Sequence, residues 1–212
     1  MTMTQPVTQP VLEGATVTLR PLASSDAAAL AVAAAESREH YVYTRVPNGV
    51  AQAETYIAAA LRERDDGRRM PFVTFWRDRV VGSTSYLDLQ QWRWPAGSPL
   101  QRTDRPDVVE IGATWLSHSA QRTRCNSEAK LLMLAHAFDV WQVHRVALKT
   151  DERNARSRWA IERLGARLDG VRRADMPGQD GSVRSSAYYS IVRAEWPAVR
   201  AKLEDALART TW

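Results

Sequence analysis

The stretch from Val108 to Asn126 reads VVEIGATWLSHSAQRTRCN and decides how the rest of the chain can fold. Its apolar, β-branched start predicts a strand over residues 108–116, and apolar residues at helical spacing predict a helix over 126–141. A strand, a short polar segment and a long helix in this order direct backbone N–H groups and the positive end of the helix dipole at one point. Arg122 and Arg124 flank that point and add charge. The segment therefore predicts an anion site suited to a pyrophosphate; the alternative is an ordinary connection with two solvated arginines.

Further strands and helices are predicted on both sides of this segment by the same criteria. The expected strands cover residues 15–20, 70–76, 79–89, 144–150, 168–174 and 182–192, and the expected helices cover 27–36, 51–64, 155–164 and 195–207. Residues 90–107 are rich in Pro, Gly and charge and predict a long loop. With 212 residues, the chain is expected to form a single domain over 13–212 that ends in the C-terminal helix, after a flexible tail over 1–12.

Composition excludes several classes of protein. The chain is 44% hydrophobic and 25% charged, as packed globular proteins are, and no run of about 18 apolar residues predicts a membrane span. The single cysteine, Cys125, excludes an intrachain disulfide and a multi-cysteine zinc site, and the four histidines lack metal-ligand spacing. Because no secretory signal is readable, we expect a cytoplasmic protein. Because of the cysteine and histidine content, we also expect no metal. The net charge of +5 is carried almost wholly by arginine, because only three of the 29 basic residues are lysine, and it is consistent with an unidentified anionic ligand.

Five short motifs resemble one known family. They are EIGATWL at 110–116, QRTRCNSEAK at 121–130, TDERNARS at 150–157, IERLGA at 161–166 and YSI at 189–191. Together they resemble the acyl-CoA-binding core of the GNAT N-acyltransferase superfamily, and they are most similar to its RimJ/RimL-like branch. The resemblance covers residues 15–193 and implies an α/β (α+β) GNAT fold, with a mixed, mostly antiparallel central sheet of six to seven strands and helices on both faces. It also implies that the sheet splays between its fourth and fifth strands, 108–116 and 144–150.

One motif departs from the family pattern. The loop of that superfamily reads Q/R-x-x-G-x-G/A, whereas this chain has Gln121, Arg124 and Asn126 at the corresponding positions and no glycine. Glycine lets a loop approach phosphate closely and adopt unusual backbone angles, so Arg124 needs a backbone conformation that tolerates a Cβ atom. We interpret the change as altered tuning of the site rather than loss of binding.

The resemblance implies where the pantetheine arm of an acyl-CoA is bound. The arm is expected in the gap between strands 108–116 and 144–150. The backbone amide of Thr114 would polarise the thioester carbonyl, and Trp115 and Leu116 would line the arm. Period-two alternation is expected to place four residues on one face of the first strand: Glu110, Gly112, Thr114 and Leu116.

The resemblance also implies where the phosphates are bound. The pyrophosphate is expected on the loop and first helical turn, which consist of Gln121, Arg122, Thr123, Arg124, Cys125, Asn126 and Ser127. Asn154 and Arg158 are further implied contacts with the coenzyme. For Asn154 a helix N-cap is a second role that can coexist with the first.

Two residues are the candidates for proton transfer. The acceptor amine arrives protonated, and Glu110 occupies the place where several family members put their base; partial burial can raise the pKa of a carboxyl group enough for this task. The alternative for Glu110 is a strand-edge charge paired with an arginine. Ser157 resembles the serine that is a candidate for protonating the CoA thiolate, and its alternative is a helix-start serine bonded to the backbone. We reject Cys125 as a nucleophile, although helix N-termini lower thiol pKa values, because the family transfers the acyl group directly.

The resemblance therefore implies an acyl-CoA-dependent N-acetyltransferase. We expect it to move an acetyl group from acetyl-CoA, as co-substrate, to a primary amine of a small molecule or a peptide N-terminus by direct attack in a ternary complex. The alternative, motivated by the glycine-free loop, is a catalytically weak GNAT-like module that binds CoA for regulation. A third hypothesis, an RNA- or ribosome-associated protein, rests on the high pI, and nucleic acid is the less expected partner. A homodimer is compatible with the resemblance, and no membrane partner is expected.

Overall fold

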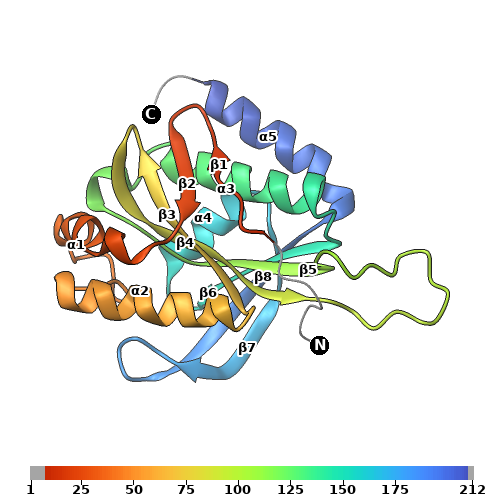
Figure 1. Ribbon diagram of the computed structural model, residues 1–212, viewed down its shortest axis with the longest axis horizontal. Coiled ribbons are helices and arrows are strands. Elements are labelled where there is room, and N and C mark those ends of the chain that lie inside the picture. The colour runs from red at the N-terminus through yellow and green to blue at the C-terminus, as the bar shows by residue number, and fades with distance from the viewer. Residues whose placement is uncertain (1–7, 210–212) are drawn as a thin grey trace.

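The computed structural model describes residues 8–209 (Figure 1). Within them, eight strands form one sheet: β1 Leu12–Glu13, β2 Val17–Pro21, β3 Arg69–Trp76, β4 Arg79–Gln90, β5 Val108–Leu116, β6 Arg145–Asp151, β7 Arg167–Pro177 and β8 Val183–Val192. Five α-helices accompany them: α1 Ala27–Ala35, α2 Val50–Asp65, α3 Cys125–Ala135, α4 Ala155–Arg163 and α5 Trp196–Ala208. The predicted strands and helices are all present, in the predicted order.

The sheet is mixed and mostly antiparallel, as predicted. Its strands follow the order β1-β2-β3-β4-β5-β6-β8-β7, and every neighbouring pair is antiparallel except β5 and β6. The strand count differs from the expected six to seven because the structure adds β1, in which Leu12 pairs with Leu19 of β2.

The N-terminal boundary of the packed domain also differs from the prediction. The expected tail covers residues 1–12, of which 1–7 lie outside the described residues. In the described part, Gln9 Nε2 donates a hydrogen bond of 2.6 Å to the carbonyl of Pro71, and the Leu12 side chain is buried in the core. Burial of a leucine side chain contributes about 2 kcal/mol. The packed domain therefore begins before residue 12.

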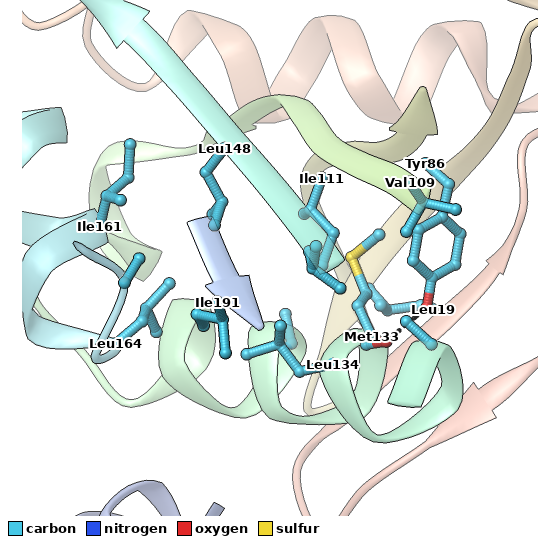
Figure 2. Close-up of a cluster of buried hydrophobic side chains, with 14 of the residues drawn as sticks. Leu19, Tyr86, Val109, Ile111, Met133, Leu134, Leu148, Ile161, Leu164 and Ile191 are labelled. Atoms are coloured by element: carbon cyan, nitrogen blue, oxygen red, sulfur yellow. Dashed lines mark hydrogen bonds between the residues drawn. The ribbon is translucent and has the colours of Figure 1, made fainter. Parts of the chain in front are cut away.

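Helices cover both faces of the sheet (Figure 1). On one face, α3 packs beside α5, and side chains of α3, α4 and α5 join one core cluster with the sheet. Figure 2 shows this cluster, in which the Tyr86 hydroxyl of β4 donates a hydrogen bond of 2.6 Å to the Met133 carbonyl of α3. On the other face, α1 and α2 pack together over a second cluster that includes Val73 and Trp115. The sheet thus separates an α3 face from an α2 face.

The sheet opens between β5 and β6. The two parallel strands pair at only three positions, where Val108–Glu110 lies beside Arg145–Ala147. Beyond them β5 continues to Leu116 and β6 to Asp151 without further pairing to each other. The predicted splay between the fourth and fifth predicted strands is therefore confirmed, and it frees the β6-facing edge of β5 from residue 111 onward.

Two connections differ in detail from the expected elements. The helix expected over 126–141 is an α-helix only to Ala135 and continues as a wider π turn over His136–Val140. The long loop, residues 91–107, extends beyond the ends of β4 and β5 (Figure 1). Its base is fixed by the buried carboxylate of Asp107, which accepts a hydrogen bond of 2.8 Å from the Trp92 amide. No helix among residues 8–209 is long and apolar enough to cross a bilayer.

Candidate active site

A β-bulge interrupts β5 in the stretch where the strand separates from β6. Ser83 of β4 pairs with Trp115 and Ser85 pairs with Gly112, so Thr84 alone lies opposite two residues, Ala113 and Thr114. The backbone of Ala113 adopts a φ of 47°, in the left-handed region that disfavours a side chain. Bulges of this kind bend a strand and redirect its side chains.

The bulge overturns the expected common face of Glu110, Gly112, Thr114 and Leu116. Before the bulge, Ile111 packs into the α3-face cluster, so Glu110 and Gly112 face α2. After it, the Thr114 hydroxyl accepts a hydrogen bond from Lys130 of α3, and Leu116 joins the α3-face cluster. Simple alternation failed because the extra residue shifts the period by one.

The bulge also sets the position of Trp115. The Trp115 side chain is buried in the α2-face cluster, so it packs in the core and does not project into the gap between β5 and β6. Only the backbone of Trp115 is therefore left to line a pantetheine arm bound in that gap. The Trp115 carbonyl approaches β4 so closely that a Cβ atom at Gly82 would lie 2.1 Å from the oxygen. Gly82 is therefore required by this approach. The Leu116 carbonyl is already occupied, because it accepts hydrogen bonds from Tyr41 and Gln121.

The predicted anion loop is formed without glycine. Arg124 has an ordinary helical backbone, with a φ of −66°, and Asn126 lies inside α3, so the two positions expected to need glycine do not need it. The left-handed residue is Arg122, with a φ of 59°. The Thr123 hydroxyl donates to the Ala120 carbonyl at 2.8 Å and accepts from the Cys125 amide at 3.1 Å. The side-chain hydrogen bonds of Thr123 thus stabilise the loop conformation, which does not depend on the flexibility of glycine.

Arg122 and Arg124, which were expected to flank the anion site together, have different surroundings. Arg122 is exposed. Arg124 is half-buried, and its Nε lies 3.4 Å from the Glu128 carboxylate. Burial raises the pKa of Glu128, but hydrogen bonds from the hydroxyl and amide of Thr16 and the amide of Val17 outweigh it and lower the pKa overall. Arg124 therefore lies beside the carboxylate that joins α3 to β2, and Glu128 offsets part of its charge.

Two arginines of α4 approach the loop, which the sequence analysis did not predict. Arg156 Nη2 donates to Gln121 Oε1 at 3.2 Å, and Arg163 Nη2 donates to Ser127 Oγ at 3.4 Å. The two residues are seven positions apart, which places them on one side of a helix. That spacing was the available signal, but only the fold brings α4 to the start of α3. The N-terminus of α3 thus has arginines from its own loop and from the neighbouring helix.

The predicted residues at the start of α4 have structural partners. Asn154 caps the helix, because its Oδ1 accepts a hydrogen bond of 3.1 Å from the Ser157 amide. Ser157 is half-buried in the first turn. The Arg158 guanidinium is directed at β8, where its Nε donates to the Tyr189 hydroxyl at 2.9 Å. The structure therefore supports the capping role of Asn154 and shows a hydrogen bond of Arg158 with β8; their contacts with a coenzyme stay predictions.

Glu110, the candidate base, is buried beside a lysine. Its Oε2 lies 3.1 Å from Lys149 Nζ of β6, so an ion pair bridges the two diverging strands on the α2 face. Burial raises the pKa of Glu110 above its usual value, and the nearby Lys149 ammonium offsets only part of the rise. The alternative partner expected for Glu110 was an arginine; the partner is Lys149, which the sequence analysis missed because it depends on the β5–β6 register.

A cavity of about 130 Å³ lies between α2, the segment containing Thr44 and the sheet. It reaches Ala113 of the bulge and is lined on its polar side by Tyr56, Glu63 and Arg69. Arg69 is buried and is held by Glu63 Oε2 at 3.1 Å and by the Ser85 hydroxyl at 2.8 Å. A ligand in this cavity would meet the bulge from the α2 face, the face that also carries Glu110.

No group of three or more His, Cys, Asp or Glu side chains in residues 8–209 could hold a metal ion. Cys125 is buried, and burial raises the pKa of its thiol to about 12. A protonated, buried thiol is a poor nucleophile. The candidate site therefore consists of a backbone bulge, a helix N-terminus with arginines, and the ion-paired carboxylate of Glu110.

Known proteins share this architecture. The acetyltransferase (GNAT) domain family matches residues 16–167. A putative acetyltransferase from T. thermophilus is 30% identical, with a TM-score of 0.76 over 95% of this chain and 98% of its own. A GCN5-related N-acetyltransferase from Brucella melitensis is 24% identical, with a TM-score of 0.79 over 99% and 90% of the two chains. RimJ of Mycobacterium smegmatis, solved in complex with CoA-disulfide, is 23% identical, with a TM-score of 0.75 over 100% of both chains. No curated protein matches the sequence.

Proposed function

The chain belongs to the acetyltransferase (GNAT) family and is an acyl-CoA-dependent N-acetyltransferase, and we propose that it transfers the acetyl group of acetyl-CoA to a primary amine of a small molecule or a peptide N-terminus. The observation that carries the proposal is the bulge at Ala113 in the unpaired part of β5. At the bulge, the β6-facing edge of β5 has no strand partner, while pairing with β4 holds the irregular backbone on the other edge. Such an edge provides an N–H donor for a thioester carbonyl that needs no reorganisation during the reaction.

The phosphates of the co-substrate would bind at the start of α3. The first turn of a helix leaves backbone N–H groups without intrahelical partners, and its dipole favours an anion. Thr123, Asn126 and Ser127 supply this part of the backbone, and the guanidinium groups of Arg122 and Arg156 supply charge. The solved complex of the RimJ relative with CoA-disulfide supports a coenzyme of this class.

The acceptor amine would enter from the α2 face through the cavity beside Ala113. Glu110 lies on that face, and its raised pKa brings the carboxylate closer to the basicity that proton abstraction requires. In the reaction, Glu110 first takes a proton from the ammonium group, directly or through a water, and so frees the nitrogen lone pair. The lone pair then forms the C–N bond as the C–S bond breaks. The Ser157 hydroxyl is the candidate donor to the departing thiolate, and the second proton that the nitrogen releases replaces the one that the serine donates.

A coupled activity and binding experiment tests the proposal. Purified protein is incubated with acetyl-CoA and a panel of primary amines and short peptides with free N-termini, and released CoA thiol is measured. Calorimetry with CoA measures binding separately. We expect binding of CoA, and thiol release with at least one acceptor. Absence of both overturns the proposal.

One observation favours the second candidate function, a CoA-binding regulatory module. Glu110 is held in an ion pair with Lys149, which would suit a structural carboxylate as well as a base. A module of this kind requires CoA binding without turnover. If CoA binds but no acceptor raises the rate of thiol release above the rate without acceptor, this candidate is favoured over the enzyme.

A further inference from the structure

Lys130 is a buried lysine that the proposed reaction does not use. It lies in α3, is 4% exposed, and points toward the sheet between β4 and β5. Its Nζ donates a hydrogen bond of 2.9 Å to the Thr84 hydroxyl and one of 2.6 Å to the Thr114 hydroxyl. Within residues 8–209, no carboxylate forms an ion pair with it. Burying an ammonium group without a carboxylate partner costs free energy, so the position of Lys130 needs a physical explanation.

The partners of Lys130 are the residues on the two sides of the β5 bulge. Thr84 is the residue of β4 that lies opposite the bulge, and its hydroxyl is 2.7 Å from that of Thr114. The Thr114 hydroxyl is also 3.3 Å from the Gly112 carbonyl, on the other side of Ala113. One amino group therefore ties together both strands at the place where their pairing is interrupted. We call Lys130, Thr84 and Thr114 the bulge clamp.

The charge on Lys130 restricts the hydrogen-bond directions within the clamp. A protonated amine can only donate, so both threonine hydroxyls must accept from it and turn their own hydrogens elsewhere. When the Thr84 hydroxyl donates to Thr114 across their contact of 2.7 Å, the Thr114 hydroxyl donates to the Gly112 carbonyl at 3.3 Å, which connects the two sides of the bulge across Ala113. A neutral amine has a lone pair and can accept from either hydroxyl, so this constraint is lost. The clamp therefore has fewer hydrogen-bond arrangements while Lys130 is charged.

The surroundings of Lys130 make its protonation responsive near neutral pH. Burial lowers its pKa to about 7, and from its own helix only the Cys125 thiol counteracts this. Glu128, in the same helix, is directed at Thr16 and Val17 of the β2 region. The facing strands present neutral hydroxyls to the amine. No nearby carboxylate therefore keeps the ammonium charged.

Resting on the proposed function, we propose that Lys130 is a positioning residue for acyl transfer: through the bulge clamp, its ammonium group fixes the backbone amide of Thr114 in the orientation that meets the thioester carbonyl. The residue touches neither the acyl group nor the acceptor amine. It acts by holding the irregular part of β5 in one conformation, and such preorganisation of a donor lowers the barrier of the chemical step. Its loss should therefore reduce kcat and leave coenzyme binding largely intact.

Three variants test the proposal. Lys130→Met keeps the length of the side chain and removes its charge, and Thr114→Val removes the hydroxyl without changing the shape. Lys202→Met is the matched control, because Lys202 is exposed on α5. We expect kcat with acetyl-CoA to fall at least tenfold in the first two variants, with the Kd for CoA within threefold of the parent. Lys202→Met should match the parent.

The pH profile distinguishes positioning from a general loss of structure. In the parent, kcat should decline as the pH rises past about 7 to 8, because Lys130 loses its proton. Lys130→Met should lack this decline. A parent-like kcat and an unchanged profile in Lys130→Met overturn the proposal. If that variant does not fold, a parent-like kcat in Thr114→Val overturns it.

A measurement without turnover separates this inference from the proposed function. Hydrogen exchange at the Thr114 amide, followed by NMR in the free and in the CoA-bound protein, reports on the clamp whether or not coenzyme binds or an acceptor is known. We expect exchange to be at least tenfold faster in Lys130→Met and Thr114→Val than in Lys202→Met. Equal exchange in all three overturns the clamp, whereas absence of both CoA binding and thiol release in the parent overturns the proposed function.

Discussion

The two faces of the sheet at the β5 bulge differ in how they hold charge. On the α2 face, buried charges are paired: Glu110 with Lys149 and Arg69 with Glu63. On the α3 face, Lys130 has only two hydroxyls as partners. Each member of an ion pair favours the charged form of the other, whereas an unpaired buried amine tends to lose its proton. On the α2 face, which is proposed to receive the amine, each ion pair therefore stabilises the charged form of its members. On the α3 face, the protonation of Lys130 responds to pH.

The largest expected effect comes from removing the carboxylate on the α2 face. Glu110→Gln is expected to lower kcat about 100-fold, because loss of a general base costs this order of rate. The Kd for CoA should change less than twofold, since Glu110 lies on the α2 face and is ion-paired with Lys149, whereas α3 covers the other face. Steady-state kinetics and calorimetry check the two values. Full activity in this variant would show that the paired face carries no catalytic base and would leave Glu110 as a structural charge.

The next effect is the pH dependence of stability due to Lys130. Its pKa is about 7 in the folded protein and about 10.5 in the unfolded chain, so between these values the unfolded state binds more protons. The free energy of unfolding contributed by this group therefore rises as the pH increases from 7 to 10.5 and is at its lowest below 7. Lys130→Met is expected to be more stable than the parent at pH 7 by a few kcal/mol and about equal to it near pH 10.5.

Urea unfolding of the parent and of Lys130→Met at pH 7 and pH 10 measures this difference. Lys202→Met serves again as the control, because an exposed lysine leaves the pH slope unchanged. A stability difference that is the same at both pH values would mean that Lys130 is not an unpaired, titrating amine, and the contrast between the two faces would disappear.

Removing the cation of the Glu110–Lys149 pair, instead of the carboxylate, is a second test of the α2 face. Lys149→Met leaves the Glu110 carboxylate buried without its cation, so the pKa of Glu110 should rise further. We expect a loss of about 2 kcal/mol at pH 7, because removing one partner of a buried pair is destabilising. The loss should be smaller at pH 4, where Glu110 is protonated in both states. The low-pH limb of activity should move to higher pH; an unmoved limb would separate Glu110 from the rate.

The smallest effect concerns the arginines around the start of α3. Arg156→Ala and Arg122→Ala are each expected to weaken CoA binding about threefold at low ionic strength and less at high salt, because these side chains are partly exposed. Arg124→Ala is the informative control, since Glu128 offsets part of its charge. Calorimetry at two salt concentrations measures the series. If Arg124→Ala weakens binding most, the charge of Arg124 reaches the phosphates after all.

The order of elements and the splay of the sheet could be predicted from the sequence because they depend on local patterns and on the motifs of β5, α3 and α4. The bulge could not, because it depends on a single left-handed residue, Ala113, whose type gives no warning. The expected common face of Glu110 and Thr114 was wrong for the same reason. A period-two pattern holds only while the strand stays regular.

The polar contacts of the site were the least predictable part. Glu110 meets Lys149 only through the parallel register of β5 and β6. Arg69 and Tyr56 meet because α2 packs on β3, which no spacing in the sequence indicates. Arg124 is assigned to the anion site by proximity in sequence, and only the structure shows that it also lies 3.4 Å from the buried Glu128 carboxylate one turn later. Side-chain partners follow from tertiary packing, and sequence neighbours are a poor guide to them.

The scarcity and placement of lysine have a consequence for a protein that handles an activated acetyl donor. The chain has three lysines, of which Lys130 is buried and Lys149 is held in an ion pair, whereas Lys202 is exposed. Guanidinium groups do not react with thioesters as amines do, so nearly all of the positive surface charge is chemically inert toward the donor. Of the three ε-amino groups, only that of Lys202 is both exposed and outside the ion pairs of the described residues, so we expect adventitious acetylation to occur there first.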